Sequence, residues 1–295
     1  MAFWSRERVT LVVEQEAVRL MAVAGDRVTR WGSAPLPRGT LDAEGGVAQP
    51  AVLAQVLERL WATQSAPKEH LFLAVPGHHV ASTVTSVSGF DTSNRRLMSE
   101  RARAALARGA SGPDAYVAWQ EIGTSVQPGL FVVAAPVALV DGYLQAIERA
   151  GLGVVTVDVK PLALVRGIGL RHCVIVDGER SLGTIILVAE ALPRRVRFQR
   201  LALPLLASPE EKIMRLGELL YETIRQYNNE EAQGEVLHPA VPVFLTGSLA
   251  DHSFLQDIAR EVLGHPIGHV KPPIALPPEM PLSQFLANIG LALKQ

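Results

Sequence analysis

The sequence lacks several features that would assign it to a common class. It has one cysteine in 295 residues, which excludes a disulfide framework. That cysteine, Cys173, stands in the apolar run HCVIV, where we expect a buried core residue. The formal net charge is −1, which gives no field for nucleic acid or for an acidic membrane surface. An arginine-rich helix over 92–109 also contains a glutamate, so we interpret it as a solvated face rather than a nucleic-acid site.

Long apolar runs are also missing. No stretch reaches the roughly 18 uninterrupted apolar residues that a membrane-spanning helix needs. The longest candidates, LFVVAAPVALV and TIILVAEAL, are shorter and fit strands or strand-to-helix junctions. The N-terminal residues MAFWSRERVT are too few and too charged for a signal peptide. We therefore expect a cytoplasmic protein that reaches a membrane only through a partner.

Familiar catalytic and metal-binding motifs do not occur. There is no Gly-x-Ser-x-Gly and no P-loop. His265 and His269 have a spacing seen in metal sites, but the intervening Pro and Gly exclude a helix and no third ligand is evident. The adjacent pair His78-His79 follows Pro-Gly in a predicted loop and indicates no function. Asp158 is a single carboxylate without an evident partner. We expect no metal site.

What the sequence does contain is a repeated order of strands and helices. Hydrophobic residues make up 48% and charged residues 19%, which allows a sizeable core. RVTLVV, AVRLMAVAG and RVTRWGSA predict an antiparallel meander, followed by a helix from Pro50 and the buried strand LFLAVPG. HCVIVDG, SLGTIILVAEA and RRVRFQRLALP repeat the meander, and Ser208 with Glu211 forms a predicted capping box for a long helix. The pattern indicates a duplicated domain.

This layout resembles the actin-like superfamily, and within it the PilM-type pilus assembly proteins, to which the cell-division protein FtsA is related. The most specific segments are residues 130–167, residues 243–267 and the ending PLSQFLANIGLALK. The resemblance implies an α/β fold, the actin-like (ribonuclease H-like, duplicated) two-domain fold. Residues 1–165 would form the first half, with a PilM/FtsA-type insert at about 78–150. Residues 166–295 would form the second half.

The resemblance also implies a function. It predicts a cytoplasmic scaffold in the inner-membrane platform of a type IV pilus, or of a related secretion or DNA-uptake machine. The partner would be the cytoplasmic tail of a PilN-like membrane protein, alongside other platform components, and oligomer formation is left open. The alternative is an active actin-fold ATPase or a small-molecule kinase. A polymerising division protein like FtsA is less favoured, because the chain ends at Gln295 without the amphipathic membrane helix that FtsA uses.

In this superfamily two hairpin turns hold the phosphates, and the first of them looks lost here. The stretch VVEQEAVRL places Val12 where the family has Asp and Glu14 where it has Gly, while Glu16 and Ala17 replace hydroxyl residues. Each carboxylate about 4 Å from a phosphate would cost roughly 1 kcal/mol in water and about 4 kcal/mol at an effective dielectric near 20. An ordinary exposed hairpin turn is the favoured interpretation.

The second turn and the adenine side are partly retained. Asp177, Gly178, Gly183 and Thr184 occur in VIVDGERSLGTIIL, and Gly247 and Ser248 occur in LTGS. An Asp-Gly hairpin needs no ligand, so a purely structural role stays open. We expect a residual nucleotide site with no catalytic residue and no certain cofactor, one that binds Mg-ATP weakly at most and does not hydrolyse it.

Overall fold

The computed structural model describes residues 7–87, 93–107, 114–123, 128–201, 208–230, 237–258, 260 and 264–294. Residues 1–6, which belong to the segment considered as a signal peptide, lie outside these ranges. Position 92 and positions 108–109 of the arginine-rich segment also lie outside them. Within the described ranges, no helix is both long and apolar enough to cross a membrane.

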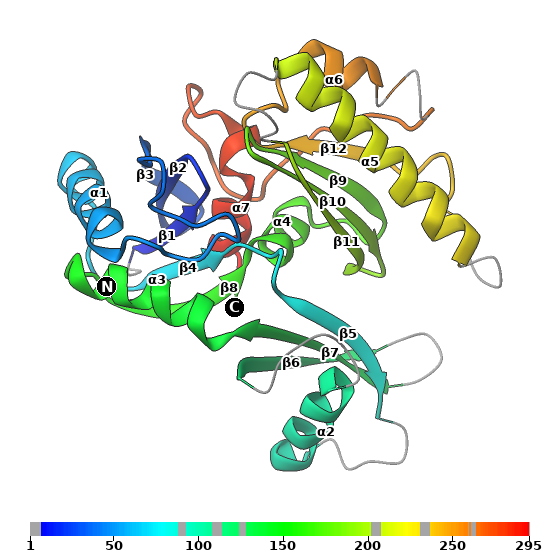
Figure 1. The fold of residues 1–295 in the computed structure, drawn as a ribbon, viewed down its shortest axis with the longest axis horizontal. Coiled ribbons are helices and arrows are strands. Elements are labelled where there is room, and N and C mark those ends of the chain that lie inside the picture. Colours follow the sequence, from blue (N-terminus) through cyan, green and yellow to red (C-terminus); the bar gives the residue numbers. More distant parts are fainter. Residues whose placement is uncertain are drawn as a thin grey trace.

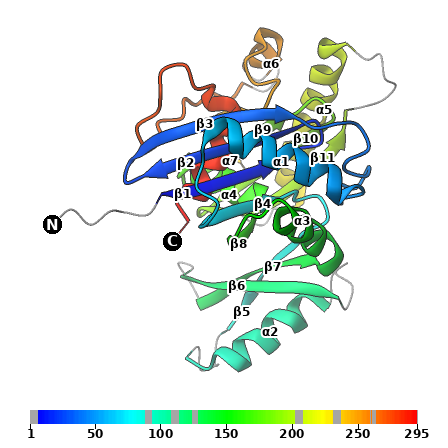
Figure 2. The same cartoon turned by 90° about the vertical axis from the view of Figure 1, so that its left-hand side faces the viewer.

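The first half is built on a five-stranded sheet with the order β3-β2-β1-β4-β8. Its strands are β1 (Arg8–Val13), β2 (Ala17–Ala24), β3 (Arg27–Pro35), β4 (Leu71–Val75) and β8 (Val154–Val159). The first three strands pair antiparallel, as the meander predicted, and β4 and β8 run parallel to β1. Helices α1 (Pro50–Gln64) and α3 (Val137–Arg149) pack on one face of this sheet through a shared apolar core (Figure 2).

The second half repeats this plan with a four-stranded sheet in the order β11-β10-β9-β12. Its elements are β9 (Cys173–Gly178), β10 (Leu182–Ala189), β11 (Leu192–Arg200), β12 (Val243–Thr246), α5 (Pro209–Glu230) and α6 (Ser253–Asp257). The predicted capping box at the start of α5 is present. The backbone N–H of Ser208 donates to Glu211 at 2.8 Å, and that of Glu211 donates to Ser208 Oγ at 3.2 Å.

A separate lobe lies between β4 and α3 and forms the lower part of Figure 1. It contains a three-stranded sheet, order β5-β7-β6, and one helix. Its elements are β5 (Ala81–Ser86), α2 (Arg95–Ala107), β6 (Ala115–Gly123) and β7 (Pro128–Pro136). The sheet of this lobe ends at Pro136, whereas the expected insert extended to about 150. Helix α3 lies in the expected insert, but its Tyr143 and Ile147 pack in the core of the first half.

Two helices between the sheets join the halves: α4 (Lys160–Ile168) and α7 (Leu282–Ala292) (Figure 1). One apolar cluster includes Val12 of the first sheet, Ile175 of the second, and side chains of both helices. The predicted core residue Cys173 is buried in the same cluster. Asn288 of α7 donates its side-chain N–H groups to the carbonyl oxygens of Thr10 at 3.2 Å and Arg19 at 3.0 Å.

The contact between α4 and α7 is close enough to require a glycine. A Cβ atom added at Gly290 would lie 1.7 Å from the carbonyl oxygen of Ala163. The obstacle is backbone in the middle of a helix, so it cannot rotate away as a side chain could. The two helices that unite the halves therefore approach each other backbone to backbone.

This packing predicts the effect of Gly290→Ala. The extra methyl group forces α4 and α7 apart, so we expect the free energy of unfolding to fall by about 3 kcal/mol or more. The control is Gly123→Ala, since a Cβ at position 123 meets nothing within 4 Å. Chemical denaturation of both variants measures the difference, and equal stability of the two would contradict the close packing.

Candidate functional site

The two turns that would hold phosphates in this fold lie against each other. Residues Glu14 to Ala17 form the turn between β1 and β2, closed by the bond from the N–H of Glu14 to the carbonyl of Ala17 at 2.8 Å. In the turn between β9 and β10, the N–H of Glu179 donates to the carbonyl of Leu182 at 2.9 Å. The hydroxyl of Ser181 in the second turn donates to a carboxylate oxygen of Glu16 in the first. The turns of the two halves are thus in direct contact.

Behind these turns lies a cluster of charged side chains, which we call the cleft network. Lys160 Nζ, on the first residue of α4, lies 2.5 Å from Glu14 Oε1 and 2.6 Å from Asp177 Oδ2. Arg19 of β2 donates from Nη1 and Nη2 to the two carboxylate oxygens of Glu179, at 2.7 and 3.0 Å. Arg19 Nη1 also lies 3.4 Å from Glu14. Each cation therefore joins acids of both halves.

All five side chains of the cleft network are buried, with 11% exposure or less. Burial raises the pKa of Glu14 to about 7, because the attraction of Lys160 offsets only part of the lost hydration. Burial alone would also raise the pKa of Glu179, but the charges of Lys160 and Arg19 and the bonds from Arg19 lower it to about 2. Burial raises the pKa of Asp177 despite its contact with Lys160. The network thus shifts two carboxyls, Glu14 and Asp177, toward the protonated form, and the pKa of Glu14 lies near neutral pH.

Little space remains at the centre of the site. The cavity bordered by Glu14, Lys160, Asp177 and Glu179 has a volume of about 20 Å³. Pockets for ligands of nucleotide size have volumes of roughly 300–1,000 Å³. A wider cavity of about 440 Å³ opens beside the turns, and Glu14 and Glu179 contribute to its wall. Glu14 and Glu179 therefore lie where this wider cavity meets the two turns.

The residues predicted for the second turn lie together, but their contacts are internal. Gly178 and Gly183 are paired across β9 and β10, as are Asp177 and Thr184. A Cβ at Gly183 would lie 2.6 Å from Leu216 of α5, so this glycine provides space for helix packing. Asp177 is bound to Lys160 rather than exposed to a cleft.

The adenine-side residues also make contacts within the protein. Gly247 has a φ of +86°, and a Cβ there would lie 2.5 Å from the carbonyl oxygen of Gly178. The N–H of Ser248 donates to Glu179 Oε2 at 3.3 Å. Gly247 and Ser248 therefore close the turn against β9, and Ser248 adds a hydrogen bond to the cleft network.

The expectation of an ordinary exposed first turn is wrong for Glu14, which is only 9% exposed. Its carboxylate points to Lys160, a residue distant in the sequence, instead of to solvent. Neither cation of the network, Lys160 or Arg19, was predicted from the sequence. Two signals were available: Arg19 interrupts the apolar strand AVRLMAV, and Lys160 directly follows the strand VVTVDV. A charged residue in either place requires a buried partner.

His265, considered as a metal ligand, is buried, and its Nδ1 lies 2.9 Å from the carbonyl oxygen of Val241. This contact gives it a structural role. Asp158, for which the sequence offered no partner, lies 3.0 Å from Arg166 and 3.3 Å from Lys294. Arg166 belongs to α4, and Lys294 follows α7.

Comparison with known proteins supports the fold. No protein-family model matches the sequence, and no curated protein matches it. A chain of the PilM-PilN type IV pilus biogenesis complex is similar over 98% of both chains, with a TM-score of 0.78 and 21% sequence identity. The cytoplasmic domain of EpsL, an inner-membrane component of the type II secretion system of Vibrio cholerae, is similar over 98% of this chain and 96% of that chain. Its TM-score is 0.55 and its identity 11%.

The ethanolamine utilization protein EutJ from Carboxydothermus hydrogenoformans is similar over 97% of this chain and 89% of that chain, with a TM-score of 0.54 and 14% identity. Together these similarities establish the actin-like fold that the sequence predicted. The resemblance to PilM-type proteins is confirmed at the level of the fold.

The cleft network predicts a pH dependence of stability. The pKa of Glu14 rises from 4.5 to about 7 on folding, so between these values the folded protein holds more protons than the unfolded chain. Its contribution to stability is therefore complete below about pH 4.5 and is lost as the pH rises through 7. The free energy of unfolding should fall by up to about 1.4 kcal/mol per pH unit in this window.

Glu14→Gln tests the assignment, because glutamine mimics the protonated carboxyl and does not titrate. We expect the variant to lose this part of the slope between pH 5 and pH 8. Urea denaturation across that range, for both proteins in the same buffers, gives the two profiles. Parallel profiles would show that Glu14 is not the group that titrates.

Proposed function

We propose that this chain is a cytoplasmic scaffold of a type IV pilus or related secretion machine, and that it binds an extended segment from the cytoplasmic tail of a PilN-like membrane protein. The observation that carries the proposal is an apolar groove between the insert lobe and the first half. The groove has a volume of about 550 Å³. Its apolar walls come from β6 and β7 of the insert and from β8, α3 and α4, and include Ala118, Phe131, Val133, Val140 and Leu162.

Two sheet edges border this groove. In the order β5-β7-β6, strand β6 stands at one edge, and in the order β3-β2-β1-β4-β8, strand β8 stands at another. Consecutive residues 116–120 of β6 and 157–159 of β8 line the groove. On β8 the carbonyl of Val157 accepts from Lys294 Nζ at 3.2 Å, and the N–H of Val159 donates to Asp158 Oδ1 at 2.8 Å. Strand β6 is therefore the edge that offers backbone N–H and C=O groups for pairing. An extended peptide can add to such an edge while its side chains enter the apolar space.

One end of the groove carries positive charge. Arg166 and Lys294 line it, together with Asp158, which contacts both. One carboxylate faces two cations, so this end favours an acidic group on the bound segment. The groove therefore offers an apolar channel, the edge of β6 and a basic end, a combination suited to a short peptide.

The comparisons support this proposal. The neighbour with a TM-score of 0.78 comes from a PilM-PilN type IV pilus biogenesis complex. Another is the cytoplasmic domain of an inner-membrane component of a type II secretion system. The second neighbour belongs to a machine at the inner membrane, and the described residues of this chain include no helix that could span a membrane. A membrane-anchored partner would supply the attachment.

The alternative, an active ATPase or small-molecule kinase, requires phosphates between the two turns. There the network places the acids Glu14, Asp177 and Glu179 around a cavity of about 20 Å³. Binding a triphosphate would require Lys160 and Arg19 to leave buried carboxylates, which leaves those charges unpaired. We therefore infer that the protein does not hydrolyse ATP and functions as a binding protein.

This inference predicts that a calorimetric titration with nucleotide shows no binding. We expect no heat when the purified protein is titrated with Mg-ATP or Mg-ADP up to millimolar concentration. Calorimetry at pH 6 and pH 8 covers both protonation states of Glu14. Micromolar binding, or release of phosphate above the no-protein blank, would favour the ATPase alternative.

The groove predicts which substitutions weaken partner binding. Ala118→Glu places a charge on an exposed, groove-lining position of β6, so we expect a labelled PilN-like tail peptide to bind at least about tenfold more weakly. Val84→Glu is the matched control, because Val84 is exposed on β5 of the same sheet and lies outside the groove. Fluorescence anisotropy measures both affinities. Equal affinities for the two variants would place the partner site elsewhere.

A further inference from the structure

A loop of the first half holds a carboxylate at the mouth of the wider cavity. Glu44 lies between β3 and α1, in a loop closed by Asp42. Asp42 Oδ1 accepts bonds from the N–H groups of Glu44 and Gly46, both at 2.8 Å, and the Asp42 N–H donates to the carbonyl of Gly46 at 2.8 Å. The buried hydroxyl of Tyr143 donates to the carbonyl of Gly45 at 2.7 Å. These bonds fix the loop and hence the position of Glu44.

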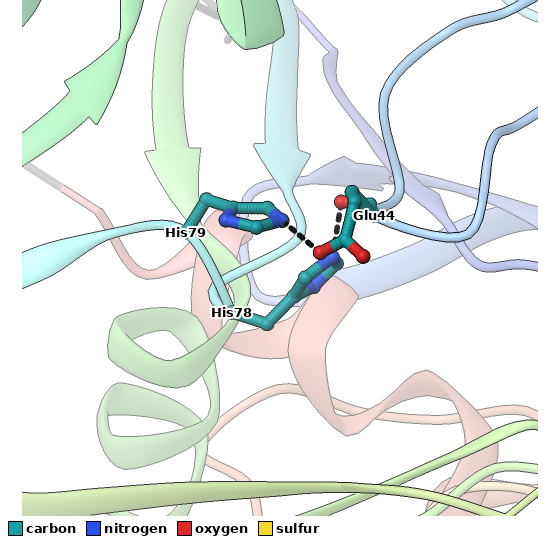
Figure 3. Close-up of side chains that lie close together, drawn as sticks. All are labelled: Glu44, His78 and His79. Carbon is teal, nitrogen blue, oxygen red and sulfur yellow. Dashed lines mark hydrogen bonds and ion pairs between the residues drawn. The ribbon is translucent and has the colours of Figure 1, made fainter.

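Two histidines face this carboxylate from the loop that enters the insert. His78 and His79 occupy the centre of a turn in which the N–H of Val80 donates to the carbonyl of Gly77 at 3.0 Å. Their ring centroids are 4.6 Å apart. His79 Nε2 lies 2.7 Å from Glu44 Oε2, and His78 Nε2 contacts the Glu44 carbonyl oxygen. Figure 3 shows both rings turned toward Glu44.

The three side chains can each direct one ligand atom to a common point. These atoms all lie within 4.8 Å of one another. Ligand atoms around a tetrahedral Zn²⁺ are roughly 3.4 Å apart for bonds near 2.1 Å. Side-chain rotation alone can close that difference for the half-exposed His79 and the exposed Glu44. His78 Nδ1 is buried and, within the described residues, has no hydrogen-bond partner.

Arg200, at the end of β11 in the second half, contacts the other carboxylate oxygen of Glu44, Oε1. This contact leaves Oε2 directed at His79. A hydrogen bond to the far oxygen of a metal-binding carboxylate is a common way to orient it. Phe198 of β11 packs edge-on against the ring of His78, with centroids 6.0 Å apart. The second half thus positions two members of the cluster without supplying a ligand.

We propose that Glu44, His78 and His79 bind one divalent transition-metal ion of the Zn²⁺ type. Two imidazoles and one carboxylate suit such an ion, whereas Mg²⁺ and Ca²⁺ prefer oxygen ligands alone. The site faces a cavity of about 440 Å³ that all three residues line, so a fourth position stays open to water or to a partner's side chain. The proposal is independent of the scaffold function.

Sequence analysis gave no reason to expect this site. The adjacent histidines have no metal spacing, and Glu44 is 34 residues away from His78 in the chain. The fold brings them together because the loop after β3 and the loop after β4 leave the same sheet near the cleft. Both loops border the cavity beside the phosphate turns.

The test is a calorimetric titration of the full chain, treated with EDTA and dialysed, with ZnCl₂. We expect the wild type to bind one equivalent. His79→Ala and Glu44→Gln should weaken binding at least about tenfold, as expected when a ligand is removed. His252→Ala is the matched control, because His252 also lies near a carboxylate, 3.6 Å from Glu210, but belongs to no group of three ligands among the residues that the structure describes.

A second measurement separates lost ligation from lost folding. Saturating Zn²⁺ should raise the thermal unfolding midpoint of the wild type and of His252→Ala, and leave that of His79→Ala unchanged. Absence of Zn²⁺ binding to the wild type would overturn the proposal. So would wild-type affinity in both His79→Ala and Glu44→Gln, or an equal loss in His252→Ala.

Discussion

The buried cleft network is the interaction on which this structure depends. Lys160 and Arg19 each bind acids of both halves, so the two halves are held together behind their two hairpin turns. Three carboxylates face two cations in a medium of low polarity, and the raised pKa of Glu14 relieves the imbalance by proton uptake near neutral pH. Removing Lys160 or Arg19 would leave an unpaired carboxylate in the interior. The network therefore both closes the cleft and makes that closure difficult to reverse.

The larger cavities of the protein lie outside the centre of the cleft. With the central space reduced to about 20 Å³, the larger spaces lie at the groove beside the insert, about 550 Å³, and at the cleft mouth, about 440 Å³. The cavity at the cleft mouth is bordered by Pro76, His78 and His79 of the segment that leaves β4 and enters the insert. The proposed peptide groove and the proposed metal site thus both involve the first half and its insert. At the mouth of the cleft, Arg200 and Phe198 of the second half contact Glu44 and His78.

Much of the fold could be predicted from the sequence, because alternating apolar residues, proline and capping residues act locally. The two meanders, the capping box of α5 and the buried Cys173 follow from neighbours in the chain. The site could not be predicted in the same way. Whether Glu14 faces solvent or a lysine depends on Lys160, which only the folded sheet brings within 2.5 Å. The same applies to Glu44 and His78, whose meeting depends on two loops that leave one sheet.

The position of α7 has a consequence for how the protein is made. This helix, residues 282–292, packs against β1 and β2, and its Asn288 binds backbone oxygens of Thr10 and Arg19. The first sheet therefore lacks part of its covering until residues 282–292 have left the ribosome. Contacts between such distant segments form slowly, and during synthesis an apolar sheet face remains open to chaperones. The duplicated halves should consequently fold as one unit after translation, rather than one after the other.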